Sequence, residues 1–126
     1  MKTIIAGSRG IIPLYGALFK IQEIIPWTIT EVVSGTAKGV DITAQRWANS
    51  IGIPVKEFPA NWDFLGREAG YLRNVEMANY ADALIAIWDG QSRGTQHMIN
   101  IAEERELLIR IYSINNKLRL LQRIRI

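Results

Sequence analysis

Short, continuous apolar runs alternate with stretches of helical periodicity along most of the chain. The apolar runs cover Thr3–Ala6, Thr30–Ser34, Ile53–Phe58, Ala83–Trp88 and Leu107–Tyr112. Runs without polar alternation are typical of strands that are buried on both faces. The four stretches between them repeat their apolar residues at helical spacing. We therefore expect an α/β fold, with a parallel sheet of about five strands and helices on both faces.

Glycine-bearing turns follow three of these predicted strands. They lie at Gly7–Gly10, Gly35–Gly39 and Gly90–Gly94. Because the strands are parallel, the turns meet at the carboxyl edge of the sheet, where ligands of such sheets bind. The third turn, Asp89–Thr95, leads directly into a helix start, whose unpaired backbone N–H groups attract anions, most often phosphate. The sequence thus predicts one pocket for a phosphate-bearing ligand at this edge.

Two segments depart from the alternation. Pro59–Gly70 contains aromatic and charged residues without periodicity, and we expect a long irregular connection there, of a kind that often has a functional role. Residues 113–126 form a basic extension beyond a predicted domain of residues 1–112, with Asn115-Asn116 at a turn. The apolar and basic residues of the extension alternate imperfectly, so an extra edge strand, a helix and a self-association arm all stay open.

Composition narrows the class of protein. Of the 126 residues, 48% are apolar, which suits one compact domain with a core. The net charge of +3 depends on Lys117, Arg119, Arg123 and Arg125, so an argument for nucleic-acid binding concerns the tail and not the domain. The chain has no cysteine, which excludes disulfides, thiolate catalysis and cysteine-ligated zinc.

Cofactor, metal and membrane sites are not expected. The single histidine, His97, is predicted to be exposed in the first turn of its helix, and nearby acids do not complete a metal site with it. The apolar runs fall short of the roughly 20 residues that span a bilayer, and Arg9 interrupts the apolar start. The dinucleotide fingerprint and the GxxxxGK[ST] phosphate loop are both absent from the sequence. We expect a cytoplasmic protein.

Five motifs follow one another in an order that is similar to the order found in a known family. They are Ile4–Arg9, Val33–Asp41, Pro59–Asp63, Arg73–Met77 and Ala81–Thr95. With this order and spacing, residues 3–112 resemble the SLOG superfamily, in particular its small YspA/YpsA-related branch. The resemblance implies a Rossmann-like fold that binds nucleotides or nucleotide-derived molecules. Relatives include the LOG phosphoribohydrolases, the DNA-processing protein DprA and sensor domains for NAD-derived signals in antiviral systems.

The resemblance also implies roles for single residues. In LOG enzymes a glycine-rich turn holds phosphate, and Gly90–Thr95 occupies that turn here. Arg73 matches the LOG catalytic arginine, but Gln96, His97 and Met98 stand where a LOG enzyme carries its glutamate. This departure argues against LOG-type glycosidic cleavage. No catalytic residue is assigned, other than Arg73 in case the protein is an enzyme.

The predicted ligand site combines backbone groups, hydroxyls and charges from the three turns and one helix. Its members are Gly7, Ser8, Arg9, Ser34, Gly35, Thr36, Lys38, Asp41, Arg73, Asn74, Trp88, Asp89, Gly90, Ser92, Arg93, Gly94 and Thr95. Gly94 and Thr95 are expected to hold a phosphate, while Arg73 and Arg93 supply positive charge. Asp41 is expected to cap its helix rather than to accept from a ribose hydroxyl.

The other two turns would contact the ligand in different ways. The first would approach it through the backbone of Gly7 and Ser8, and the second, through Ser34–Thr36, would meet a ribose or a second phosphate. Trp88 either packs in the core or stacks on a ring of the ligand. Arg73, considered without the resemblance, is expected to be solvated on the polar side of its helix.

Three classes of function fit these features. The preferred one is a binding module that senses or sequesters a nucleotide or a nucleotide-derived signal, such as one derived from ADP-ribose, in a phage or antiviral setting. The second is an enzyme that cleaves an N-glycosidic bond, with Asp41, Asp63, Glu68 or Asp89 as acid or base. The third, by analogy with DprA, is a nucleic-acid binder that uses the basic tail. A homodimer or higher homo-oligomer is also expected.

Overall fold

The computed structural model describes residues 1–66, 68–115 and 117–125. Its elements, in chain order, are β1 (Lys2–Gly7), α1 (Tyr15–Ile24), β2 (Glu31–Ser34), α2 (Val40–Ser50), β3 (Val55–Glu57), α3 (Trp62–Leu65), α4 (Glu68–Tyr80), β4 (Ala83–Ile87), α5 (Arg93–Glu104), β5 (Leu108–Ile114) and β6 (Leu118–Ile124). Asn116, in the turn predicted for the C-terminal extension, and Ile126, at its end, lie outside the described residues.

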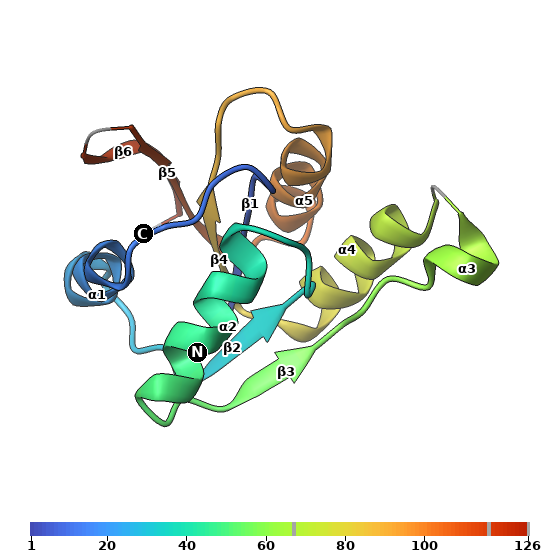
Figure 1. Ribbon diagram of the computed structural model, residues 1–126. Coiled ribbons are helices and arrows are strands. Elements are labelled where there is room, and N and C mark those ends of the chain that lie inside the picture. The colour runs from blue at the N-terminus through green and yellow to red at the C-terminus, as the bar shows by residue number, and fades with distance from the viewer. Residues whose placement is uncertain (67, 116, 126) are drawn as a thin grey trace.

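One six-stranded sheet runs through the molecule in the order β3-β2-β1-β4-β5-β6. The first five strands of this order are parallel, and β6 pairs antiparallel with β5 (Figure 1). The predicted α/β class with a Rossmann-like parallel sheet is confirmed. Of the three possibilities left open for the C-terminal extension, the structure shows the edge strand, and β5 continues to Ile114, past its predicted end at Tyr112.

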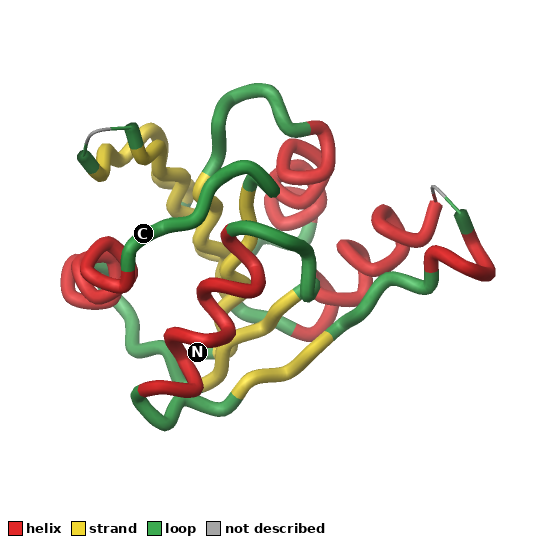
Figure 2. Tube along the Cα trace, viewed as in Figure 1, coloured by secondary structure: helices red, strands yellow, loops and turns green. Residues whose placement is uncertain are grey.

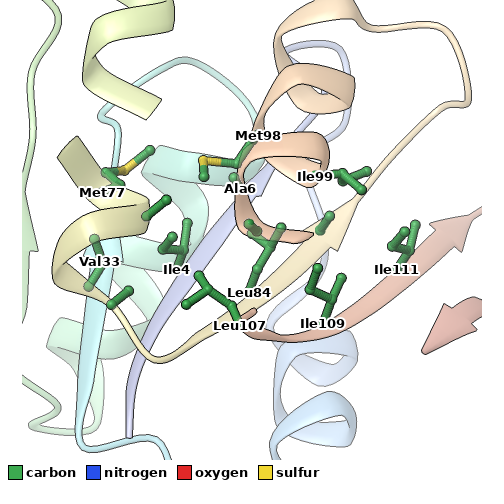
Figure 3. Packing of buried hydrophobic residues seen from close by; sticks show 14 residues of the cluster. Ile4, Ala6, Val33, Met77, Leu84, Met98, Ile99, Leu107, Ile109 and Ile111 are labelled. Atoms are coloured by element: carbon green, nitrogen blue, oxygen red, sulfur yellow. The ribbon is translucent and has the colours of Figure 1, made fainter. Parts of the chain in front are cut away.

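Helices cover both faces of the sheet, so its central strands lie between two apolar layers (Figure 2). On one face, α1 and α2 pack over the strands, and the fully buried Trp47 of α2 is the largest side chain there. On the other face, Met77 of α4 and Met98 of α5 lie over Ile4 and Leu84 (Figure 3). All five residues of β4 are buried. This double burial explains why the strands appear in the sequence as continuous apolar runs.

The segment Pro59–Gly70 is more regular than the sequence predicted. Residues 62–65 form the short helix α3, and α4 begins at Glu68. The turn is closed by backbone N–H groups of Leu65 and Gly66, which donate to the carbonyl groups of Asn61 and Trp62 at 2.9 and 3.0 Å. A helix of one turn is too short to leave a periodic apolar pattern, and the prediction of an irregular segment was wrong for this reason.

The turn after β4 is shorter than predicted. The sequence placed Asp89–Thr95 in the turn, whereas α5 already begins at Arg93. Gly94 and Thr95 therefore belong to the first turn of the helix. Among the described residues, no helix is long and apolar enough to cross a membrane.

Candidate functional site

The carboxyl ends of β1 and β4 define the edge on which the candidate site lies. These strands are neighbours at the centre of the sheet, and Gly7 pairs with Ile87 where both end. The chain leaves β1 toward β2 on one side and leaves β4 toward β5 on the other. Strand order reverses at this point, which is where open α/β sheets bind ligands.

A cavity of about 290 Å³, called the central cavity below, opens at this edge. The predicted site residues that line it are Gly7, Arg9, Asp41, Arg73, Asn74, Asp89, Ser92, Gly94 and Thr95. The predicted residues that do not line it are Ser8, Ser34, Gly35, Thr36, Lys38, Trp88, Gly90 and Arg93. All three turns contribute to the site, but the turn after β2 does so through Ala37 and not through Ser34–Thr36.

Five further residues line the cavity and were not among the predicted site residues, although Gly10 and Ala37 lie within the predicted turns. They are Ala6, Gly10, Ala37, Met77 and Met98. The two methionines are buried side by side between α4 and α5 (Figure 3) and form an apolar part of the wall. Met77 lies three positions after Asn74, and Met98 three after Thr95, so helical spacing places them on the faces of the predicted site residues. That spacing is the signal that could have found them.

The first turn of α5 presents unpaired backbone donors to the cavity. Ser92 is the N-cap residue and makes no side-chain capping bond. Within the described part of the chain, the amides of Arg93, Gly94 and Thr95 have no hydrogen-bond acceptor, as expected for the first residues of a helix. The Thr95 hydroxyl is buried and lies 3.2 Å from the Ser92 hydroxyl. A Cβ added at Gly94 would meet no protein atom within 4 Å, so the backbone there is open.

Asp89 holds the turn that precedes this helix. Its Oδ1 accepts hydrogen bonds from the amides of Gln91 and Ser92, both at 2.8 Å. These two bonds are the main reason that the pKa of Asp89 lies below its usual value. The backbone N–H of Asp89 in turn donates to the buried Ser8 hydroxyl at 3.0 Å. Asp89 and Ser8 therefore stabilise the shape of the site.

Asp41 is a buried carboxyl group in the lining of the cavity. It accepts hydrogen bonds from the amides of Gly7 at 3.3 Å and Ala37 at 3.4 Å. Burial raises the pKa of Asp41 to about 6, and this effect is partly offset by Arg73, by the two amides and by Arg9. The expected role as a helix cap is wrong, because the N-cap of α2 is Gly39 and the Asp41 oxygens instead bind the amides of Gly7, at the end of β1, and Ala37, in the turn after β2.

Arg73 is half-buried and faces into the site, not into solvent as its helical position alone suggested. Its Nη1 donates to the carbonyl oxygen of Gly35. A Cβ at Gly35 would lie 2.5 Å from that Nη1 and 2.8 Å from Oδ2 of Asp41, so only glycine leaves room for this arrangement. Burial and the nearby Arg9 lower the pKa of Arg73, while Asp41 raises it.

Asn74 links α4 to the start of α5. Its Oδ1 accepts from Nε of Arg73 at 3.1 Å, and its Nδ2 donates to the carbonyl oxygen of Gly94 at 3.2 Å. The same Nδ2 lies 3.1 Å from Nδ1 of His97. His97 is half-buried against the ring of Tyr71, at a centroid distance of 4.6 Å, so the prediction of an exposed histidine was wrong. The reason is that α4 packs against this face of α5.

Five other predicted residues, Gly7, Ser8, Ser34, Thr36 and Trp88, have contacts within the protein. The Gly7 amide is bonded to Asp41, as described, and the Ser8 amide donates to the carbonyl of Ile87 at 3.0 Å, so both amides are paired within the protein. The Ser34 hydroxyl accepts from the amide of Thr36, a residue with a φ of 62° that is unusual for a β-branched side chain. Trp88 is partly buried against the core.

The family is shown by comparison with known proteins. Residues 1–64 match the YspA, cpYpsA-related SLOG family (YAcAr). The chain belongs to this family.

A phage protein is similar to part of the chain. The Gene 61 protein of Mycobacterium phage D29 is 37% identical over 79 residues, an alignment that covers 58% of this chain and 63% of the phage protein. The chain thus spans less than two thirds of the length of that relative.

Proposed function

We propose that the protein binds a phosphate-bearing nucleotide or nucleotide-derived molecule in the central cavity. The observation that carries this proposal is the open first turn of α5, which lines the same cavity as two arginines, Arg9 and Arg73. A helix start combines unpaired amides with partial positive charge, which favours a phosphate. Arginine adds charge and bidentate hydrogen bonds. Membership of the SLOG family supports a nucleotide as the source of the phosphate.

The residues of the first turn of α5 also leave space for the anion. Gly94 has no neighbour where a Cβ would stand, and the turn has no acidic residue that would repel a phosphate. Thr95 supplies a hydroxyl beside its own amide. We place the phosphate on the amides of Gly94 and Thr95, with the Thr95 hydroxyl as a further donor.

Titration calorimetry with AMP and adenosine tests this proposal. AMP should bind, and adenosine, which lacks the phosphate, should bind at least about 10-fold more weakly. Thr95→Val should lower the affinity for AMP about 10-fold, which corresponds to about 1.4 kcal/mol, a typical value for one hydrogen bond to a charged group. Thr43→Val, in α2 and outside the cavity lining, is the matched control and should bind AMP normally. Equal affinities for AMP and adenosine, or no binding of either, would contradict the proposal.

A second function, hydrolysis of an N-glycosidic bond, is supported by Asp41 and the nearby Arg73, which both line the central cavity. A carboxyl group with a pKa of about 6 is suited to proton transfer near neutral pH. Of the other carboxylates proposed from the sequence, Asp63 and Glu68 are exposed and do not line the cavity, and Asp89 is held in its turn with a lowered pKa. Asp41 is therefore the best placed acid or base.

Chromatography after incubation with AMP and NAD separates the two functions. The binding proposal predicts no release of base or nicotinamide above the rate without protein. Sustained release that disappears in both Arg73→Ala and Asp41→Asn would instead establish the hydrolase. Release that persists in both variants would point to a contaminating enzyme.

A further inference from the structure

A second hollow lies on the other side of the α5 start. It has a volume of about 400 Å³ and is called the side hollow below. The side chains that matter in it are those of Tyr71, Trp88, Arg93, Gln96, His97 and Asn100. Successive residues of the turn line the two spaces in alternation. Ser92 and Gly94 line the central cavity, and Gln91 and Arg93 line the side hollow. Residues 91–94 of this turn therefore line both spaces.

The side hollow has aromatic walls, in contrast to the charged central cavity. Tyr71 of α4 is 46% exposed, and its ring meets the ring of His97 edge to face, with 68° between the planes. The indole of Trp88 is held in place by a hydrogen bond from its Nε1 to the carbonyl oxygen of Ser92, at 3.0 Å. The exposed ring of Tyr71 and the partly exposed indole of Trp88 offer surfaces on which a flat ring can stack.

Hydrogen bonding determines which ring nitrogen of neutral His97 carries the proton. Arginine can only donate and a carbonyl can only accept, so the contacts to Arg73 and Gly94 determine the orientation of the Asn74 amide. Its remaining N–H then points to Nδ1 of His97, which has to accept. The proton of the neutral ring is therefore on Nε2. Burial lowers the pKa of His97, against a smaller opposing effect of Glu104, and this favours the neutral form.

The hollow also offers paired polar groups. Nε2 of Gln96 donates to Oδ1 of Asn100 at 2.8 Å. This leaves the Gln96 carbonyl oxygen as an acceptor and the Asn100 amide hydrogens as donors. Together with Nε2–H of His97, the hollow presents donors and an acceptor beside aromatic rings, which matches the edge and the faces of a nucleobase.

We propose that the side hollow binds the base of the same nucleotide whose phosphate lies on the first turn of α5. The inference rests on the proposed function and adds to it the part of the ligand that provides specificity. The ligand then crosses the turn, with its phosphate on the side of Gly94 and its ring between Tyr71 and Trp88. The exposed Arg93 lies where the ligand crosses and is available to its phosphate.

Affinities for AMP and ribose 5-phosphate, which differ by the base, provide the test. For the wild-type protein, AMP should bind about 10-fold or more tightly than ribose 5-phosphate, as expected for one stacked base. Tyr71→Ala should reduce this ratio at least about fivefold and leave the affinity for ribose 5-phosphate unchanged. Tyr15→Ala is the matched control, because Tyr15 is a similarly exposed tyrosine, 40% exposed, on α1 at the opposite face of the sheet. It should change neither affinity.

The outcomes distinguish the inference from the proposed function. If both ligands bind with equal affinity, or if Tyr71→Ala leaves the ratio unchanged, the side hollow does not hold the base, although the phosphate site stands. If neither ligand binds, both the proposed function and this inference fail. Should Tyr71→Ala not fold, nuclear Overhauser effects between adenine protons and the Tyr71 ring in the wild-type complex decide, and their absence would overturn the inference.

Discussion

Two helices, α2 and α5, begin at the same edge of the sheet after a glycine-bearing turn, and their first turns differ in surroundings. α2 follows Gly39 and carries Asp41 in its first turn, whereas α5 follows Ser92 and has no acidic residue there. Neither N-cap residue makes a side-chain capping bond. By sequence pattern alone, both helix starts qualify as anion sites.

The start of α2 is closed by the protein itself. Gly39 has a φ of 78°, and a Cβ there would lie 2.5 Å from the carbonyl oxygen of Arg9 and 2.7 Å from those of Ser8 and Ile11. The buried carboxyl group of Asp41 adds negative charge next to the helix start. Gly39 is thus required for close packing, whereas Gly94 of α5 is surrounded by open space. A glycine turn identifies an anion site only when nothing in the protein already occupies it.

The largest expected effect is on stability, and it should differ between substitutions of Gly39 and Gly94. Gly39→Ala should lower the free energy of unfolding by about 4 kcal/mol, because the added methyl group is both crowded and placed on a strained backbone. Gly94→Ala should raise it by about 0.5 kcal/mol, since alanine is the better helix former. Urea unfolding of both variants measures the difference. Equal effects would show that the two helix starts are packed alike.

The second effect concerns the charge of Asp41. The pKa of Asp41 is about 6 in the folded protein and near 3.8 in the unfolded chain, so the folded state binds more protons between these values. Stability should therefore fall by about 2.4 kcal/mol as the pH rises from 4 to 7. Asp41→Asn cannot titrate and should lack this component.

Unfolding in urea at several pH values, for the wild-type protein and for Asp41→Asn, gives the difference in stability at each pH. This difference should shift in favour of the asparagine variant by about 2.4 kcal/mol over the stated range. A difference that does not change with pH would mean that Asp41 titrates normally and that the start of α2 is less enclosed than described.

The smallest of the three effects is expected for a substitution that gives the first turn of α5 an acidic residue, as the first turn of α2 has. Gly94→Asp places an acid in the first turn of α5, where it should weaken AMP binding about 30-fold, or about 2 kcal/mol, through charge repulsion and occupation of the amides. Stability should change by less than about 1 kcal/mol, because an acid is tolerated at a helix start. Gly16→Asp on α1, also at an open position, is the control for added charge. Unchanged AMP affinity in Gly94→Asp would place the phosphate elsewhere.

Most of the sheet could be predicted because its strands are buried on both faces. The apolar run at Ala83–Trp88 is a local signal, and it predicted the bounds of β4 to within one residue, although the turn that follows is shorter than predicted. The sequence did not decide the conformation of the segment that forms β6, because its apolar and basic residues alternate imperfectly. It is an edge strand whose residues from Arg119 to Arg123 are exposed, so burial imposes no clear alternation on it.

The candidate site was predicted less completely than the fold. Residues within motifs, such as Asp41, Arg73 and Thr95, line the central cavity as positions close to the sheet edge should. The contacts of His97 depend on which faces of α4 and α5 meet, and this is decided by tertiary packing that no local pattern reports. The buried methionines were missed because an apolar residue in a helix is usually assigned to the core alone.

The two outer strands of the sheet have a consequence for behaviour at high concentration. An open sheet edge is a template on which other chains can add as strands and aggregate. β3, at one edge, has only three residues and follows Pro54, and β6, at the other, has an irregular register opposite Ile111 and Tyr112 and exposed arginines at 119 and 123. Short length, proline, irregular pairing and repelling charge each discourage strand addition. The C-terminal hairpin thus ends the sheet and blocks its growth.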